Sequence, residues 1–277
     1  MAVLLALCSA ASYGVGDFFG GLAAKRAPAA AILLWSHLVG IVLLLGASVF
    51  VGGDLTARDF AIGAVGGVAG AAGVGLLYQA LSIGPMSAVA PVTALLAAAV
   101  PVAAGVARGE RPGAAAAVGM LAGVAAIVLV SAEGGGSLRP SDLRGVTFAL
   151  GAGLGFGLFF VALSYTGDDS GVWPLVGARA VSVTTVGTLA LLGRFASTVP
   201  AGQPRLLTAG AGALDVAANV LYLFAIREGL LSVVSVLASL YPASTVVLAW
   251  LVLRERFAPL QRVGLLLAVP AAILMSV

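Results

Sequence analysis

Four ionisable side chains lie inside long apolar stretches of the sequence: Asp17, His37, Arg179 and Asp215. An ionisable group in hydrocarbon costs about 2.5 kcal/mol or more, so it normally faces a partner or a water-filled cavity. Asp17 lies about seven residues before the end of the first apolar stretch, and His37 lies about six residues after the start of the second. Both side chains are therefore expected roughly 10 Å deep in the membrane, on the same side. A carboxylate beside an imidazole can relay protons. We predict that Asp17, His37 and Asp215 are proton-coupling groups; the alternative is that Asp17 and His37 are structural.

Arg179 occupies the place in the second half of the chain that His37 occupies in the first, 142 positions earlier. Matched groups that can carry positive charge favour an anionic moiety on a bound molecule, and arginine binds carboxylate or phosphate with a planar fork. The alternatives are an arginine that extends to the membrane surface, or an internal ion pair with Asp168 or Asp169.

Polar and aromatic side chains share helix faces with these groups. Tyr13 precedes Asp17 by four residues, and Asn219 and Tyr222 follow Asp215 by four and seven, spacings that keep each set on one face of a helix. In the other half, Phe156 and Phe160 match Tyr13 and Asp17, and Tyr78 matches Tyr222, either as cavity lining or as packing aromatics. The predicted substrate-binding side chains are Tyr13, Trp35, Tyr78, Arg179, Asn219, Tyr222 and Tyr241.

The composition is that of a membrane protein. Of the 277 residues, 61% are hydrophobic and 9% charged, and the mean hydropathy is +1.14. A soluble domain carries about 25% charged residues, because its surface faces water. Soluble enzymes and nucleic-acid binders are therefore excluded. Cys8 is the single cysteine, which excludes an intrachain disulfide and a thiolate metal cluster.

Charges, prolines and turn residues divide the chain into ten apolar segments. Each must be helical, since lipid satisfies no backbone hydrogen bonds. The predicted spans are 2–24, 31–51, 60–80, 86–106, 113–131, 144–166, 172–192, 206–226, 231–253 and 258–277. The fold class is thus an all-α membrane protein with ten transmembrane helices.

The longest polar stretch lies midway along the chain and divides it into a first repeat (1–131), a linker (132–143) and a second repeat (144–277). Leu77-Tyr78 matches Leu221-Tyr222, and Val118-Gly119 matches Val263-Gly264, with offsets of 144 and 145 residues. A steady offset indicates a duplication. With five helices in each copy, the second copy inserts upside down, as in the inverted repeats of secondary transporters.

Short motifs at the segment ends resemble those of a known family. Gly109-Glu110-Arg111 follows the fourth segment and Arg254-Glu255-Arg256 the ninth, and together they resemble the repeat signature of EamA-type members of the drug/metabolite transporter superfamily. Tyr13 to Gly21, followed by Lys25-Arg26-Ala27-Pro28, is similar to the first helix of one bacterial branch. The resemblance implies two inverted repeats of five helices and export or exchange of metabolites, amino acids or drugs. One residue departs from the family pattern. The proline that is often found in the ninth-helix motif is Pro242 here, whereas the matching position in the first repeat is Ala97.

Several residues have structural interpretations. Gly63, Gly67 and Gly70 belong to a ridge of small residues that predicts close helix packing. Pro91, Pro101 and Pro242 permit kinks in the fourth and ninth segments. We interpret Glu110 and Glu255 as residues that cap a helix N-terminus or fix a turn.

The distribution of charge leaves two orientations open. Nine basic residues fall on the side opposite the N-terminus and four on its own side. The positive-inside rule then places both termini outside, whereas many relatives of the family that the chain resembles are thought to have both inside. Thirteen arginines against one lysine are typical of high-GC bacterial coding, so we expect a multi-pass protein of a bacterial plasma membrane.

These features favour a secondary transporter of a small organic solute that works by alternating access, coupled to protons or running as an exchanger. The alternative is a passive pore or a lipid-translocating protein. No Walker, His-Glu-x-x-His or Gly-x-Ser-x-Gly motif occurs, so no enzyme, catalytic residue, cofactor or metal site is expected. The expected partners are the small-molecule substrate, the lipid bilayer and protons, without nucleic acid, for a monomer or a homodimer.

Overall fold

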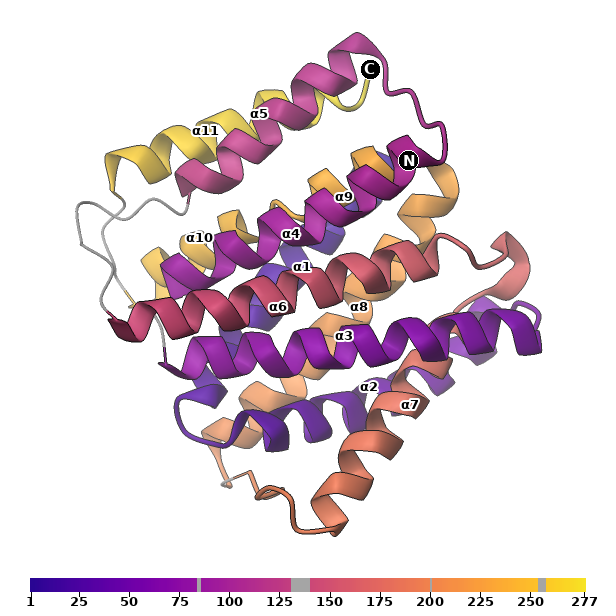
Figure 1. Ribbon diagram of the computed structural model, residues 1–277, viewed down its shortest axis with the longest axis vertical. Helices are drawn as coiled ribbons and strands as arrows, with labels where there is room; N and C mark the ends of the chain where they lie inside the picture. The colour runs from indigo at the N-terminus through magenta and orange to yellow at the C-terminus, as the bar shows by residue number, and fades with distance from the viewer. Residues whose placement is uncertain (84–85, 131–139, 200, 254–257) are drawn as a thin grey trace.

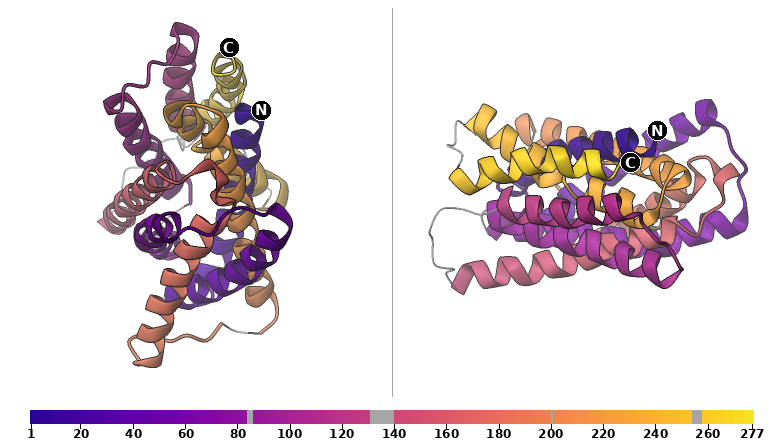
Figure 2. Two further views of the ribbon diagram at one scale, coloured as in Figure 1. Left: turned by 90° about the vertical axis from the view of Figure 1, so that its right-hand side faces the viewer. Right: turned by 90° about the horizontal axis from the view of Figure 1, so that it is seen from above.

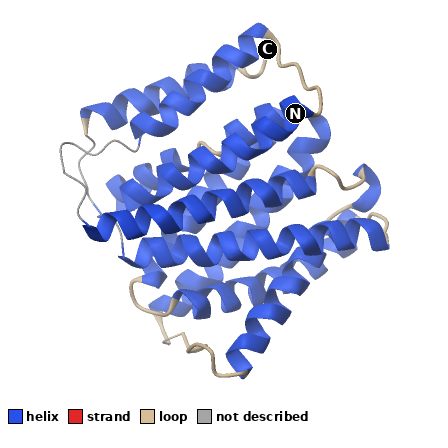
Figure 3. Ribbon diagram, in the orientation of Figure 1, coloured by secondary structure: helices blue, strands red, loops and turns tan. Residues whose placement is uncertain are grey.

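Helices are the only regular secondary structure among the described residues, and loops and turns connect them. The computed structural model describes residues 1–83, 86–130, 140–199, 201–253 and 258–277 (Figures 1 and 3). Within these ranges the elements are α1 (Ala2–Ala24), α2 (Ala29–Val51), α3 (Ala57–Ile83), α4 (Met86–Ala107), α5 (Ala114–Val130), α6 (Pro140–Leu163), the 3₁₀ helix η1 (Asp168–Ser170), α7 (Trp173–Leu191), α8 (Gln203–Glu228), α9 (Leu231–Ala238), α10 (Tyr241–Leu253) and α11 (Pro259–Leu274).

Eight helical segments of the described chain are long and apolar enough to cross a membrane, one of them formed by α9 and α10 together. The helices α5 and α11 have 17 and 16 residues, and they pack along each other at one side of the bundle (Figure 1). The prediction of an all-helical membrane protein is confirmed, whereas the count of ten spans stays a prediction. The division into a first repeat, a linker and a second repeat also stays a prediction; α6 begins at Pro140, within the predicted linker, and Ala132 to Arg139 lie outside the described residues.

The predicted ninth span is not one helix. It breaks between Ala238 and Tyr241, immediately before Pro242. Proline has no N–H group and clashes with the preceding helical turn, which explains the break. The helix α4 runs through Pro91 and Pro101 without interruption, so the two segments differ in geometry.

The predicted glycine ridge packs α3 against two helices of the second half. Gly63 and Gly67 lie against the backbone of Pro174 and Ala178 in α7, so close that a Cβ atom would clash. On the neighbouring side of α3, Gly70 lies against the ring of Phe159 in α6. Such close approach replaces the missing hydrophobic drive within lipid. The helices of the two halves therefore interleave, with α1 on α8 and α3 between α6 and α7.

Most helices run roughly along one axis, with α7 and α8 inclined to it (Figure 1), and both termini lie toward the same end (Figure 2). We call this end the N-terminal face; it also carries the connections from α2 to α3 and from α6 to α7. The opposite face carries the connections from α1 to α2 and from α7 to α8.

Glu110 caps a helix of the other half. Its two carboxylate oxygens accept hydrogen bonds from the backbone N–H groups of Leu231 and Ser232, at 2.8 and 3.0 Å. Every residue of α9 is buried, so its first N–H groups need protein partners. This geometry bears out the capping interpretation of Glu110, while Glu255 and its motif lie outside the described residues.

We expect Glu110→Ala to lower the free energy of unfolding by about 1–2 kcal/mol, because the buried N-terminus of α9 loses its cap. Thermal melting of the purified protein measures this change. Glu228→Ala is the matched control, since Glu228 is half-exposed and its ion pair with the N-terminus spans 4.0 Å. Equal melting temperatures for the two variants would contradict the capping role.

Candidate functional site

A cavity lies in the interior of the bundle, between the two halves of the chain. Seven helices line it: α1, α3 and α4 from the first half and α6, α7, α8 and α10 from the second. Its lining residues are Tyr13, Gly16, Asp17, Gly70, Val74, Tyr78, Ala97, Phe156, Phe159, Phe160, Arg179, Ala211, Asp215, Asn219 and Tyr241. Both halves therefore build a single site.

The cavity is narrow in this structure. About 40 Å³ is open to the centres of water molecules, and one water needs about 10–15 Å³ on this measure, so the cavity has room for about three. Pockets for small organic molecules are far larger, at about 300–1,000 Å³. Binding of an organic molecule therefore requires the helices around the cavity to move apart.

A polar network of six side chains follows the cavity: Ser182, His37, Arg179, Asp215, Asn219 and Tyr13. Arg179 donates through Nη1 to His37 Nε2, at 3.0 Å, and through Nη2 to Asp215 Oδ2. Asn219 Nδ2 donates to Asp215 Oδ1 at 3.2 Å, and the Tyr13 hydroxyl donates to Asn219 Oδ1 at 2.9 Å. The network links α7, α2, α8 and α1.

The network fixes the state of His37. A guanidinium has only donors, so His37 Nε2 must accept the hydrogen bond from Arg179. The ring proton then lies on Nδ1, which contacts the Ser182 hydroxyl. His37 is therefore a neutral imidazole in this arrangement.

Arg179 is an internal partner of Asp215. Its side chain is 7% exposed and forms an ion pair with the Asp215 carboxylate. The alternatives of a surface-directed arginine and of pairing with Asp168 or Asp169 are both wrong.

The predicted contact between Asp17 and His37 is absent. The ring of His37 is 1% exposed and contacts Arg179 and Ser182, both on α7. Asp17 lines the cavity from α1 and forms no hydrogen bond or ion pair within the described residues. The depths estimated from the sequence place Asp17 and His37 at a similar level in the membrane. They do not say which way each side chain points, and His37 faces α7 instead of α1.

Two predicted substrate-binding residues do not line this cavity. Trp35 is 49% exposed, and its indole N–H donates to the backbone oxygen of Ser197 at 2.8 Å, beside a separate groove. Tyr222 is fully buried behind Phe160, with the ring centroids 4.0 Å apart, and its hydroxyl lies 2.7 Å from that of Ser235. For Tyr222 the packing alternative is the correct one.

Seven of the ten predicted site residues do line the cavity: Tyr13, Asp17, Tyr78, Arg179, Asp215, Asn219 and Tyr241. Their roles in binding and coupling stay predictions. The sequence analysis missed the aromatic wall formed by Phe156, Phe159 and Phe160 of α6. A signal was available, because Phe156 and Phe160 match Tyr13 and Asp17, and inverted repeats bring matched residues to the same central site.

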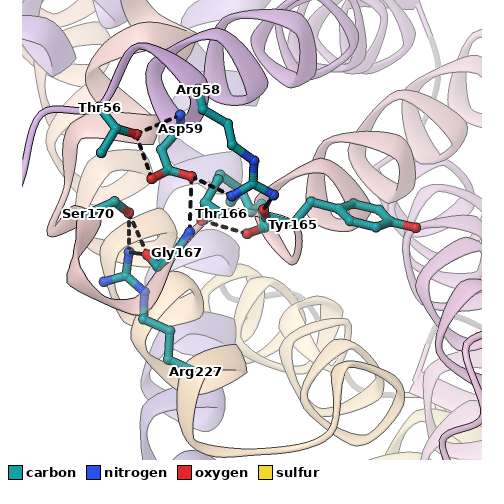
Figure 4. Close-up of polar contacts among 9 residues, drawn as sticks. Thr56, Arg58, Asp59, Tyr165, Thr166, Gly167, Ser170 and Arg227 are labelled. Carbon is teal, nitrogen blue, oxygen red and sulfur yellow. Dashed lines mark hydrogen bonds and ion pairs between the residues drawn. The ribbon is translucent and has the colours of Figure 1, made fainter.

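Partly buried hydrogen bonds connect the two halves at the N-terminal face. The Asp59 cluster consists of Thr56, Asp59, Gly167, Ser170 and Arg227 (Figure 4). The Asp59 carboxylate is buried and accepts hydrogen bonds from the Thr56 hydroxyl and the Gly167 N–H, at 2.8 and 3.0 Å. From the other side, Arg227 Nη2 donates to the Gly167 oxygen at 3.2 Å and to the Ser170 hydroxyl at 2.8 Å. The connection from α6 to α7 is thereby held between α3 and α8.

The opposite face is connected more weakly. The side chain of Arg26, after α1, donates to that of Gln203, at the start of α8, and both residues are exposed. Exposed polar pairs contribute about 0–1 kcal/mol. The contacts that connect the two halves therefore differ in strength between the two faces.

Comparison with known proteins identifies the chain's relatives. The model of the EamA-like transporter family matches residues 1–132 and again residues 143–277. One solved structure, described only as "Crystal structure of protein", superposes with a TM-score of 0.75 over 98% of both chains, at 17% sequence identity. This likeness shows a shared fold. No curated protein matches the sequence.

Proposed function

Because the chain belongs to the EamA-like transporter family, we propose that it is a secondary transporter that exports or exchanges a small organic solute by alternating access. The proposed architecture has ten spans in two inverted repeats, with the cavity between them as the transport site. The observation that carries the proposal is the cavity itself, because both halves line it and one of its carboxylates, that of Asp17, has no hydrogen-bond or ion-pair partner among the described residues.

Contacts between matched residues support the inverted repeat. His37 and Arg179 occupy matching positions in the two halves, and they hydrogen-bond to each other. A residue can touch its own counterpart only near a two-fold axis that relates the repeats. The contacts at the two ends match as well. The start of α3 meets the connection after α6 at the N-terminal face, and the start of α8 meets the connection after α1 at the opposite face.

The narrow cavity favours a carrier over a passive pore. A pore needs a continuous open path, whereas the cavity between the two faces has room for about three waters. Solute must therefore pass by alternate breaking of the contacts at the two faces. Asp17 is the proposed coupling group, since its carboxylate can exchange a proton for another positive charge.

Asp59→Ala is expected to open the N-terminal face. The variant removes two buried hydrogen bonds, worth about 1–3 kcal/mol, and each 1.4 kcal/mol shifts an equilibrium about tenfold. In a Cys8→Ser background, a cysteine at the cavity position Ala97 should react about tenfold faster with a membrane-impermeant maleimide added at this face. Labelling of vesicles of known orientation measures this rate.

Asp54→Ala is the matched control, because Asp54 is exposed and contributes only its backbone N–H to Asp169. It should leave the labelling rate unchanged. Equal rates for Asp59→Ala and Asp54→Ala would contradict the gating role of the Asp59 cluster. Rapid labelling from both faces in the starting protein, together with solute flux that rises linearly with concentration, would overturn the carrier itself.

A further inference from the structure

We propose that the transported solute is an organic cation with an aromatic or apolar body, and that Asp17 is its counter-ion. This inference rests on the proposed transporter function and names its substrate class. It reverses the expectation from the sequence, in which Arg179 would bind an anionic group.

The first step concerns the net charge of the side chains that face the cavity. The titratable groups in its lining are those of Asp17, Arg179, Asp215 and the tyrosines Tyr13, Tyr78 and Tyr241. Arg179 and Asp215 neutralise each other in an ion pair. The hydrogen bond from Arg179 keeps His37 neutral, and the tyrosines carry no charge in their phenol form. The negative charge of Asp17 then has no compensating positive charge among the described residues that line the cavity.

The second step is that the charge of Arg179 is already paired. Its two terminal nitrogens each donate a hydrogen bond, one to His37 and the other to the Asp215 carboxylate. A carboxylate or phosphate would compete with Asp215 for the guanidinium and would bring another negative charge into a cavity that already holds that of Asp17. Like charges in a space of low dielectric repel strongly.

The aromatic wall carries the third step. Tyr13 lies with its ring centroid 6.0 Å from that of Phe160 and 6.4 Å from that of Tyr241, and further rings come from Tyr78 and Phe156. Ring faces attract cations by about 0.5–2 kcal/mol, and most strongly when water is excluded. Hard metal cations instead require several oxygen ligands. A single free carboxylate among aromatic rings therefore fits an organic cation.

Binding to the purified protein tests the proposal without relying on transport. The probe is phenyltrimethylammonium, whose charge is permanent, and the comparison ligands are the anion 3-phenylpropionate and the neutral 2-phenylethanol. Isothermal titration calorimetry should show that the cation binds about tenfold or more tightly than either comparison ligand. Equal or tighter binding of 3-phenylpropionate, or no binding of the cation at millimolar concentration, would overturn the proposal.

Variants then assign the charge to one residue. Asp17→Asn should weaken binding of the cation about tenfold or more and leave that of 2-phenylethanol unchanged, whereas Asp17→Glu should retain cation binding. Asp54→Asn removes an exposed carboxylate outside the cavity and should have no effect. Cation binding that is unchanged in Asp17→Asn would overturn the role of Asp17. The comparison of ligands on the unmodified protein stands even if a variant does not fold.

The two proposals fail in different ways. Saturable flux of another solute, without cation binding, would contradict the substrate class and leave the transporter intact. Tight cation binding without flux across proteoliposomes would contradict the transporter and leave the binding site intact.

Discussion

Arg179→Ala is expected to destabilise the protein by about 3–5 kcal/mol, because it leaves the Asp215 carboxylate in the cavity without a counter-ion. Asp215 is 20% exposed, and its remaining side-chain partner is Asn219. A neutral pair of similar shape removes both charges at once, so the double variant Arg179→Met/Asp215→Leu should recover most of the loss. Thermal melting of the three purified proteins measures these effects.

Arg58→Ala is the control for this series. The Arg58 side chain is 69% exposed and pairs with Asp59 at 3.5 Å, so its loss should cost about 1 kcal/mol or less. If Arg179→Ala melted no lower than Arg58→Ala, the ion pair with Asp215 would not hold the bundle together.

Asp17→Asn is expected to have the opposite signature, with loss of transport and little change in stability. Asp17 forms no hydrogen bond or ion pair within the described residues, so an amide of the same shape breaks no contact there. Loss of a desolvated charge partner costs about 2 kcal/mol or more for a bound cation. Uptake of labelled phenyltrimethylammonium into proteoliposomes should therefore fall about thirtyfold or more. A lowered melting temperature with unchanged uptake would assign Asp17 a structural role instead.

These two variants distinguish charges with different roles in one cavity. Arg179 and Asp215 neutralise each other and join α7 to α8, so their contribution is mainly structural. Asp17 contributes a charge that has no partner among the described residues. Such a group is available to a charged solute, whereas a side chain with a strong internal partner must lose that partner before it can bind one.

Much of the fold could be predicted from composition and hydropathy. Lipid forces each long apolar segment into a helix, so the segments and their order were predictable. The break before Pro242 was foreseen only as a kink. Proline marks where a helix is weakened, but the packing around it decides whether the helix bends, breaks or, as at Pro91 and Pro101, continues.

The site was predictable in its residues and less so in its contacts. The cost of placing ionisable groups in lipid identified Asp17, Arg179 and Asp215, and all three line the cavity. Their partners depend on how each helix is rotated about its axis. Depth alone therefore wrongly paired Asp17 with His37, and matched positions did not reveal that His37 and Arg179 bond to each other.

Trp35 and Tyr222 show the same limit. An aromatic residue in a polar context can line a cavity or pack against a neighbouring helix, and the sequence treats these cases alike. Tyr222 packs on Phe160, and Trp35 binds the backbone of Ser197 outside the cavity. The repeat correspondence was the better guide, because it relates Phe156 and Phe160 to Tyr13 and Asp17 at one site.

Counterflow in proteoliposomes tests the central claim most directly. Vesicles that contain the protein are loaded with unlabelled phenyltrimethylammonium, and uptake of the labelled compound from outside is followed. A carrier with Asp17 as counter-ion predicts saturable uptake that the internal cation accelerates, and loss of both features in Asp17→Asn. The account would be contradicted by uptake that rises linearly with the external concentration of the cation, is unchanged by the internal cation and persists in Asp17→Asn.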